Sequence, residues 1–401
     1  MWEYLDNGSV TSVKGFQAAG LNCGLKKVKK DLALIVSTYP ATAAGTFTLN
    51  KAQAAPVILC KRIIDEGKKV KAILINSGNA NACTGVNGFN DAVEVQKYCA
   101  DKLNIAQNEV LVSSTGVIGE RLKVDIVKSG IEKIVPLLSE EGGNDATEAI
   151  MTTDLKKKNY ALRIALSKGD IIIGGICKGS GMIHPNMATM LAFITTDAEI
   201  EGKLLQKAIS QAVSQTFNKI SVDGETSTND MVIVLANSTS GVKIEDSTLE
   251  YSLFVTALNN LCRTMAKAIV ADGEGATKLI TISIKNAKSD MDADTVAKAI
   301  AKSPLVKTAI NGCDANWGRI ISAAGSSGAD INPKNTSIFF DNHPVLLPDY
   351  KVVVDEEKAK KILSKNEIKI ELDLGEGASS TTWWTCDFSE EYIKINANYR
   401  S

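Results

Sequence analysis

Lys178-Gly-Ser-Gly-Met-Ile-His-Pro-Asn-Met-Ala-Thr-Met-Leu191 runs directly into Ala192-Phe-Ile-Thr-Thr196, a short apolar run that is typical of a buried strand. Glycines and Pro185 interrupt both helix and strand patterns, so Lys178-Gly-Ser-Gly-Met182 predicts a turn-forming loop and a candidate boundary between packed units. The loop delivers Ala188-Thr189 to the start of the strand. There the threonine hydroxyl could attack the carbonyl that precedes it.

On both sides of this stretch, short strands alternate with longer helices. The apolar patterns predict strands at 71–75, 109–113, 192–196, 229–236, 278–284, 368–374 and 391–395, and helices at 90–103, 122–138, 199–220, 249–270 and 295–310. At 401 residues the chain exceeds the usual size of one domain, so two or more packed units are expected. The pattern predicts a mixed α/β (α+β) protein with layered sheets and helices.

The composition excludes several classes of function. Lys and Arg number 45 against 46 Asp and Glu, and a net charge of -1 creates no field that would attract nucleic acid or an acidic membrane surface. The short basic runs at 26–30 and 156–158 are interpreted as solvated faces. No apolar run approaches the roughly 18 residues that span a bilayer, and Glu3 and Asp6 stand where a signal peptide would be basic and then apolar. We therefore expect a cytoplasmic protein with no membrane partner.

Metal and nucleotide chemistry find little support in the residue pattern. The eight cysteines form no C-x-x-C pair, and only His184 and His343 could join them as ligands, so no metal site is expected. Both histidines precede proline, which suits a structural turn at least as well as a catalytic base. Neither common phosphate-binding glycine motif is present, and 272–278 fails the spacing. An N-terminal threonine needs no histidine, because its own α-amine, with a pKa of roughly 7.7 to 8.0, can act as the base.

An Ala-Thr dipeptide at the start of a strand is usually unremarkable, but the stretch 179–191 resembles the self-processing motif of the ornithine acetyltransferase family. This family is also called the bifunctional glutamate N-acetyltransferase/amino-acid acetyltransferase family. Further segments resemble family blocks in the family's order from end to end: Gly15-Phe-Gln-Ala-Ala-Gly20, Asn76-Ser-Gly-Asn-Ala-Asn-Ala-Cys-Thr-Gly85, Ser114-Thr-Gly-Val-Ile-Gly119, Asp223-Gly-Glu-Thr-Ser-Thr-Asn-Asp230, Asp272-Gly-Glu-Gly-Ala-Thr-Lys278, Asp314-Ala-Asn-Trp-Gly-Arg319 and Ile395-Asn-Ala-Asn-Tyr-Arg400.

The resemblance implies a fold, a processing event and a reaction. The fold would be the layered αββα sandwich that this family shares with the β-aminopeptidases. The precursor would cleave itself between Ala188 and Thr189 into an α chain, 1–188, and a β chain, 189–401, which stay packed together, with α2β2 heterotetramers expected. Thr189 would then take the acetyl group from N-acetylornithine, release ornithine and pass the acetyl group to glutamate, giving N-acetylglutamate. No bound cofactor is expected, and some family members also use acetyl-CoA.

The same resemblance assigns roles to individual residues. Thr115 and Gly116 match the oxyanion-hole pair, which is chemically sensible because a glycine lets a backbone N–H approach a ligand closely. The positions that match substrate-binding residues are Thr152, Lys178, Thr189, Glu274, Asn396 and Ser401. By position alone, Lys178 and Glu274 would be interpreted as surface charges. Asn396 and Ser401 contribute only if the C-terminal tail folds back over the site.

Two departures and two alternatives accompany this interpretation. Ser401 stands where many relatives have Thr, and Thr381-Thr-Trp-Trp-Thr-Cys386 differs from the usual Trp-Gly-Cys pattern. One alternative is a self-processing aminopeptidase or amidohydrolase of the same architecture, which would pass its acyl group to water and typically uses serine. The other is a single-chain binding protein that stays uncut. The residues do not decide whether acetyl-CoA is used.

Overall fold

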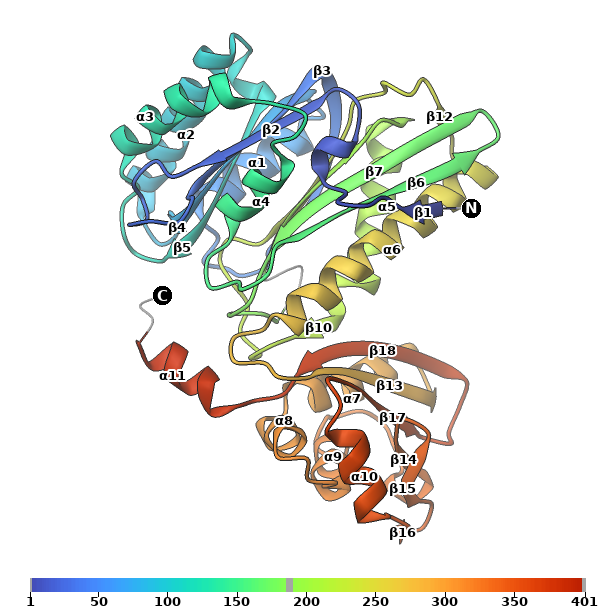
Figure 1. Cartoon of the computed structure of the whole chain (residues 1–401). Helices are drawn as coiled ribbons and strands as arrows, with labels where there is room; N and C mark the ends of the chain where they lie inside the picture. The colour runs from blue at the N-terminus through green and yellow to red at the C-terminus, as the bar shows by residue number, and fades with distance from the viewer. Residues whose placement is uncertain (1, 185–189, 399–401) are drawn as a thin grey trace. The chain divides into compact units, whose positions relative to one another are not determined.

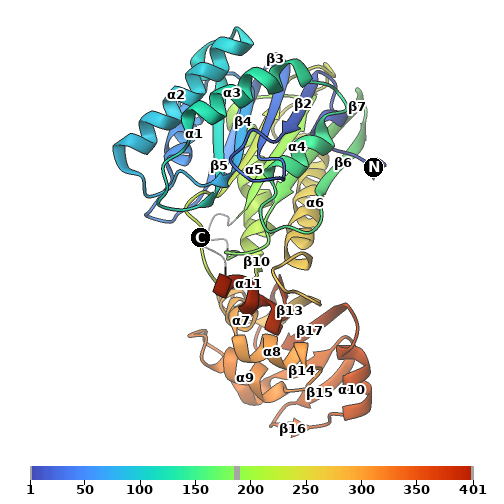
Figure 2. The same cartoon turned by 60° about the vertical axis from the view of Figure 1, so that its left-hand side comes forward.

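The computed structural model describes residues 2–184 and 190–398 of the chain (Figures 1 and 2). These residues form two compact units. The first contains residues 2–218 and 225–269, and the second contains residues 219–224 and 270–398. Each unit has a sheet and helices of its own, so the expectation of at least two packed units is confirmed.

The first unit contains most of the secondary structure. Its strands are β1 (Trp2–Tyr4), β2 (Phe16–Leu21), β3 (Leu32–Phe47), β4 (Val70–Asn79), β5 (Val110–Val117), β6 (Lys158–Leu166), β7 (Gly169–Lys178), β8 (Leu191–Thr196), β9 (Glu199–Ile200), β11 (Met231–Ala236) and β12 (Lys243–Ile244). Its helices are η1 (Val10–Ser12), α1 (Ala55–Asp65), α2 (Gly85–Leu103), η2 (Gln107–Glu109), α3 (Val124–Ile134), η3 (Val135–Leu137), α4 (Gly143–Ile150), α5 (Gly202–Gln215), η4 (Phe217–Lys219) and α6 (Leu249–Ala271); η4 and α6 each run on into the second unit.

One large mixed sheet organises this unit. Its strand order is β1-β6-β7-β8-β11-β3-β4-β5, with β2 pairing to β3 beside this path. Strand β8 is parallel to β11 and antiparallel to β7, and all six of its residues are buried. Strands β4 and β5 are parallel neighbours, so their carboxyl ends meet at one edge of the sheet. Because β8 and β11 lie between β7 and β3, residues from after position 189 are inserted between strands from before it.

Helices cover both faces of the sheet (Figure 1). At β7, a Cβ on Gly175 would meet Leu261 and Met265 of α6, whereas one on Gly174 would meet the backbone at Ser9, which caps η1. Adjacent strand residues point to opposite faces, so α6 and η1 lie on opposite sides of β7. Helix α5 lies beside α6 and is joined to it by a hydrogen bond from Asn259 to Gln215 (2.6 Å).

The second unit has a seven-stranded sheet with the order β10-β18-β13-β17-β14-β15-β16. The strands are β10 (Ile220–Ser221), β13 (Leu279–Ala287), β14 (Ser337–Phe340), β15 (His343–Leu347), β16 (Lys351–Val352), β17 (Glu367–Asp373) and β18 (Ser379–Cys386). The helices are α7 (Asp290–Lys302), α8 (Pro304–Asn311), α9 (Trp317–Gly325), η5 (Pro333–Asn335), α10 (Glu356–Leu363) and α11 (Glu390–Asn398). The unusual segment 381–386 lies in β18, where Trp383 and Trp384 are buried.

Most expected elements are present, so the predicted mixed α/β class is confirmed, but three elements differ. The helix expected at 199–220 is strand β9 followed by α5, and the helix expected at 295–310 is split into α7 and α8 at Pro304, which starts the second helix. The strand expected at 391–395 is wrong, because this segment is helix α11. The hydroxyl of Ser389 accepts a hydrogen bond from the Glu391 N–H (3.2 Å), and acidic residues occupy the first turn, which favours a helix start.

The expected unit boundary at 178–182 is also wrong. Strands β7 and β8 flank the glycine-rich stretch and pair with each other, with Lys178 opposite Leu191. Both flanks are therefore neighbours in one sheet, and the stretch lies inside the first unit. Glycine and proline here interrupt the strand pattern without separating two cores.

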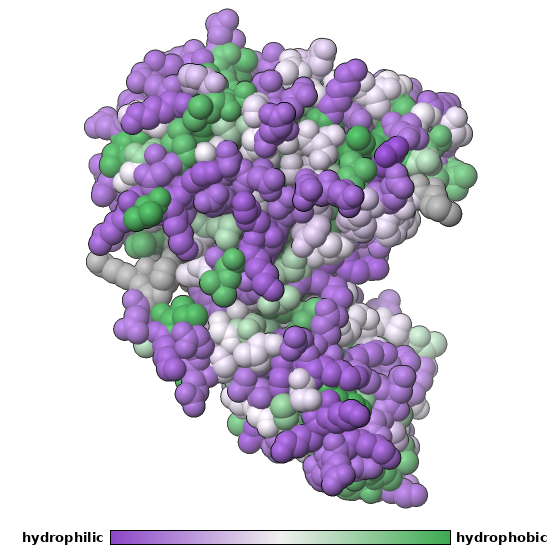
Figure 3. Space-filling model, in the orientation of Figure 1, coloured by the Kyte–Doolittle hydropathy of each residue, from purple (hydrophilic) through white to green (hydrophobic). Residues whose placement is uncertain are grey.

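Within residues 2–184 and 190–398, no helix combines the length and the apolar character needed to cross a bilayer. On the face shown in Figure 3, hydrophilic side chains predominate and hydrophobic ones form small separate groups.

The buried central strand β8 leads to a prediction about stability. Phe193 is fully buried, so Phe193→Ala should lower the free energy of unfolding by about 3 to 5 kcal/mol. Val86→Ala is the control, because Val86 is 77% exposed and its loss should change stability by less than about 0.5 kcal/mol. Urea unfolding followed by circular dichroism measures both changes. Equal midpoints for the two variants would contradict the central position of β8.

Candidate active site

The predicted oxyanion residues lie where the parallel strands β4 and β5 end. Thr115 is opposite Ser77 and Gly116 is opposite Gly78. Both glycines have positive φ, +98° at Gly78 and +134° at Gly116, and a Cβ on Gly116 would lie only 2.4 Å from the carbonyl carbon of Gly78. Only glycine fits this close approach without strain. At the ends of β4 and β5, the backbone at Gly78 and Gly116 is therefore not covered by a side chain of its own.

Buried amide side chains hold this strand end in place. Asn229 donates to the carbonyl oxygen of Ser114 (2.8 Å), the residue before Thr115, and to that of Ala80 (2.6 Å). The Ser114 hydroxyl donates to Asn76 Oδ1 (2.6 Å), and Asn76 donates to the carbonyl of Asn79 (2.8 Å). Three of the sequence blocks quoted above thus meet in one hydrogen-bonded network, and that network fixes the backbone that leads into Thr115 and Gly116.

Lys26 connects the strand ends to the loop that carries Thr152. Its Cγ is 3.1 Å from the position of a Cβ on Gly78, and its Nζ donates to the carbonyl of Met151 (2.5 Å). Burial lowers the pKa of the Lys26 ammonium to about 8; the charge of Asp31 opposes this effect and the charge of Lys178 adds to it. Lys26 thus places a partly buried cation beside the segment that leads into Thr152.

The carboxylate of Asp154 connects Thr152 to Gly179, the residue after Lys178. One oxygen accepts the Thr152 N–H (3.0 Å), and the other accepts the N–H of Gly179 (2.7 Å) and the ammonium of Lys158 (2.8 Å). Burial raises the pKa of the Asp154 carboxyl, but the charges of Lys178 and Lys158 and the hydrogen bonds outweigh burial and hold that pKa well below its usual range. Asp154 is therefore an anion inside a basic cluster.

In the second unit, Glu274 and Asn396 are in direct contact. Asn396 Nδ2 donates to Glu274 Oε2 (2.8 Å). Helix α11 therefore brings Asn396, one of the predicted substrate-binding residues, to the turn that carries Glu274. The Ser389 hydroxyl donates to the Gly275 carbonyl (2.6 Å), and a Cβ on Gly275 would lie 2.4 Å from the Tyr392 nitrogen. Residues Ser389, Tyr392 and Asn396 are therefore packed tightly against this turn.

The same turn is fixed by a buried carboxylate that precedes α11. Asp387 accepts hydrogen bonds from the N–H groups of Thr277 and Lys278 (both 2.8 Å), and also from the Thr277 hydroxyl and from Asn311. Asp387 is fully buried, so these bonds form away from competing water. The block 272–278, which fails as a phosphate loop, thus forms a rigid turn around Glu274.

The predicted residues therefore fall into two described groups. Thr115, Gly116, Thr152 and Lys178 belong to the first unit, and Glu274 and Asn396 to the second. Ala188, Thr189 and Ser401 lie outside the described residues. The residues that follow Thr189 are described: Met190 accepts a hydrogen bond from the Met231 N–H (3.2 Å), and Leu191 pairs with Lys178.

Sequence reasoning misjudged the charges in both groups. Lys178 and Glu274, which position alone suggested were surface charges, are only 8% and 6% exposed. The solvated face expected at 156–158 is wrong for Lys158, which is 1% exposed because it pairs with buried Asp154. Asp154 and Asn229 were missed as supporting residues. The spacing of four between Asp154 and Lys158 was the available signal, but such spacing is common on solvated helices.

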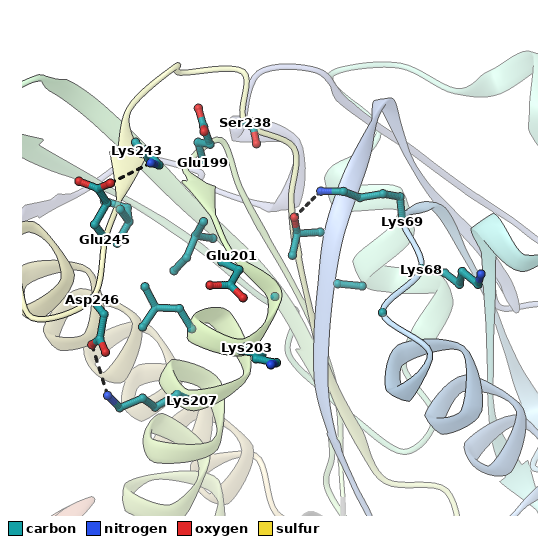
Figure 4. A pocket seen from close by; sticks show the side chains of 17 residues that line it. Lys68, Lys69, Glu199, Glu201, Lys203, Lys207, Ser238, Lys243, Glu245 and Asp246 are labelled. Atoms are coloured by element: carbon teal, nitrogen blue, oxygen red, sulfur yellow. Dashed lines mark hydrogen bonds and ion pairs between the residues drawn. The ribbon is translucent and has the colours of Figure 1, made fainter.

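The described residues include a charged groove but no group of metal ligands. Within the described part of the chain, no three His, Cys, Asp or Glu residues are grouped so as to hold a metal ion. A groove of about 690 Å³ lies in the first unit near the start of α5 (Figure 4). It is lined by lysines and acidic residues, two pairs of which are bonded, Lys207 with Asp246 and Lys243 with Glu245. None of the predicted site residues lines this groove.

Comparison with known proteins decides the family. The ArgJ family description matches residues 17–401. The chain belongs to the ArgJ family. The arginine biosynthesis bifunctional protein ArgJ of Bacillus thuringiensis subsp. konkukian is 47% identical over 398 residues, which cover 99% of this chain and 98% of that protein. The ArgJ of Streptococcus mutans serotype c is 46% identical over 396 residues, with 98% and 99% covered. A crystal structure of ArgJ from Bacillus halodurans is 42% identical over 47% of this chain and 98% of that chain, with a TM-score of 0.45.

Membership of the ArgJ family confirms the resemblance drawn from the sequence blocks. It also supports the acetyltransferase interpretation over the alternative of a self-processing aminopeptidase, because the match to ArgJ proteins extends over nearly the whole chain. The same match supports an enzyme over a binding protein without catalytic activity.

The contact between Gly116 and Gly78 predicts the effect of one added methyl group. Gly116→Ala should abolish both chain cleavage and acetyl transfer, because its Cβ would overlap the backbone of Gly78 and force β4 and β5 apart. Gly202→Ala is the control, because a Cβ at Gly202 would meet only one methyl group, at 3.6 Å. Gel electrophoresis and an ornithine-release assay measure both effects. Normal cleavage and turnover in folded Gly116→Ala protein would remove this strand end from the mechanism.

Proposed function

We propose that this ArgJ-family enzyme moves the acetyl group of N2-acetyl-L-ornithine to L-glutamate in a ping-pong reaction, after it has cleaved itself between Ala188 and Thr189. The products of cleavage would be chains 1–188 and 189–401. The single observation that carries the proposal is the whole-chain match to ArgJ. The unshielded backbone at Gly116 and the basic cluster around Lys178 support it, because both occur at positions that the family resemblance assigns to the reaction.

In the proposed cleavage, the Thr189 hydroxyl attacks the carbonyl carbon of Ala188. The peptide C–N bond breaks as the acyl group moves from nitrogen to oxygen, and the released nitrogen takes up a proton to become the α-amine of Thr189. Water then hydrolyses the ester, which leaves the Ala188 carboxylate and restores the Thr189 hydroxyl. Cleavage and acetyl transfer thus use one nucleophile for the same kind of attack on a carbonyl.

In the proposed transfer, the α-amine of Thr189 accepts the hydroxyl proton as the oxygen attacks the acetyl carbonyl. The tetrahedral intermediate collapses and expels the nitrogen of ornithine, which takes the proton. The amine of glutamate then attacks acetyl-Thr189, forms N-acetylglutamate and frees the hydroxyl. Thr115 and Gly116 would stabilise the oxyanion of each intermediate, and loss of one such donor commonly costs about 3 to 4 kcal/mol in the barrier.

The proposed substrate contacts pair each charged side chain of the site with a substrate group of opposite charge. Lys178 would pair with a substrate carboxylate, and Glu274, which Asn396 contacts, would receive the side-chain amine of ornithine or orient the Thr189 α-amine. Thr152 would add a hydroxyl near Lys178, and Ser401 would add one from the tail. Ornithine and glutamate both carry an α-carboxylate, so one basic group can serve both halves of the cycle.

Assembly, compartment and cofactors complete the proposal. We propose an α2β2 assembly and a cytoplasmic location; the eight cysteines support the latter because they are free thiols, as a reducing compartment maintains them. The mechanism needs no bound cofactor. Acetyl-CoA as a second acetyl donor belongs to the family resemblance and is a separate question for experiment.

Intact mass spectrometry under denaturing conditions tests the self-processing step. The purified protein should separate into chains that end at Ala188 and begin at Thr189. Thr189→Ala should give one uncut chain with no transferase activity, because it lacks the hydroxyl that attacks in both reactions. Thr195→Ala, four residues beyond Leu191 in β8, is the control for loss of a threonine hydroxyl and should still be cleaved. Cleavage and turnover in Thr189→Ala would refute the assignment of the nucleophile.

The identity of the acetyl acceptor separates a transferase from a hydrolase. With N2-acetyl-L-ornithine alone, the enzyme should release about one ornithine per site and then stop, because the acetyl-enzyme waits for an amine. Added glutamate should restore continuous release with equal formation of N-acetylglutamate. Continuous release without glutamate would indicate hydrolysis instead. In a parallel reaction, acetyl-CoA with glutamate alone decides whether the enzyme also starts from acetyl-CoA.

A further inference from the structure

Asp154 is a buried carboxylate that connects two separate segments of the first unit. It lies only 2% exposed, directly after the loop that carries Thr152, and it accepts the Thr152 N–H on one oxygen and the Gly179 N–H on the other. Thr152 and Gly179 come from different parts of the chain. Thr152 lies in the loop after α4, and Gly179 directly follows β7. One side chain therefore sets the spacing between Thr152 and the residue next to Lys178.

The charge of Asp154 is balanced from within the fold. Lys158, 1% exposed at the start of β6, donates to Asp154 (2.8 Å) and also to the carbonyl of Lys156 (3.2 Å). In the sheet, Lys158 is opposite Cys177, the residue before Lys178, so the register of β6 and β7 fixes where the ammonium lies. A buried charge is tolerated when it is both paired and hydrogen bonded, and Asp154 meets both conditions.

Asp154, Lys158 and Lys178 together carry an excess positive charge that could bind an anionic ligand. Two ammonium groups, Lys158 and Lys178, act on the single carboxylate of Asp154, so the trio carries a net charge of +1. Lys158 is directed to Asp154 by a hydrogen bond, whereas the Lys178 ammonium interacts with Asp154 through charge. This arrangement keeps Lys178 near the carboxylate while leaving its ammonium able to bind an anion.

We propose that Asp154, held by Lys158, is a positioning residue that fixes Thr152 and Lys178 for the carboxylate of the acetyl donor. This inference deepens the proposed function and rests on the substrate role that it gives to Thr152 and Lys178. Asp154 itself does not contact the substrate. It acts by holding the two peptide N–H groups and by balancing the positive charge beside them.

The test is a double-mutant cycle on the mature, cleaved enzyme. Asp154→Asn keeps the size of the side chain but removes the charge and replaces one acceptor by a donor. With N2-acetyl-L-ornithine, Asp154→Asn should raise KM at least about tenfold, as expected from loss of hydrogen bonds to a charged group, while kcat changes less than about threefold. In a Lys178→Met background the same substitution should raise KM by no more than about threefold, because only Thr152 is then left for Asp154 to position.

A matched control removes a buried carboxylate elsewhere in the first unit. Asp197 is also buried, and its carboxylate accepts the Ile172 N–H (2.8 Å), which is far in sequence from the described site residues Thr115, Thr152 and Glu274. Asp197→Asn should leave KM and kcat unchanged even if it melts at a lower temperature. If Asp154→Asn does not fold, Asp154→Asn with Lys158→Met is compared with Lys158→Met alone, since removal of both buried charges is better tolerated than removal of one. The same rise in KM is expected.

The outcomes separate this inference from the proposed function. If Lys178→Met leaves KM unchanged, the substrate role of Lys178 fails and the inference fails with it. If Lys178→Met raises KM but Asp154→Asn does not, or raises it equally in both backgrounds, only the positioning role is overturned. A rise in KM that is much smaller in the Lys178→Met background is the result that supports Asp154 as a positioning residue.

Discussion

The pairing of β8 with both β7 and β11 is the constraint on which the first unit depends. Its six buried residues are hydrogen bonded on two sides, so the chain after position 190 has one register and one direction. That register puts Leu191 opposite Lys178 and the carbonyl of Met190 against Met231. The sheet therefore fixes where residues 191–196 lie relative to Lys178.

Buried charge is the second theme of the fold. Asp154 and Asp387 each accept peptide N–H groups from a segment near a predicted site residue, Lys178 in the first unit and Glu274 in the second. Each charge lies away from bulk water and gains strength from the lower local dielectric, whereas an incomplete set of partners would be costly there. Rigid turns thus result from electrostatics as well as from glycine.

Much of this architecture was predictable from the sequence, and the failures have physical causes. Strands such as β4, β8 and β13 are short apolar runs, so the apolar pattern alone predicts them. Residues 391–395 were misjudged because the capping contact of Ser389 outweighs a weak strand pattern. The burial of Lys158 depends on a sheet register and a carboxylate that spacing cannot place. For the candidate site, family-like blocks predicted the residues, but only the structure could show that Asn229 and Asp154 form hydrogen bonds beside them.

The strand order has a consequence for the two products of the proposed cleavage. In the sheet, β8 and β11 of the later segment lie between β7 and β3 of the earlier one, so the earlier polypeptide would flank this strand pair on both sides. Such products are interlocked rather than docked, and neither would complete the sheet of the first unit alone. Their union would resemble the interior of one domain, so partners could be exchanged between molecules only by unfolding.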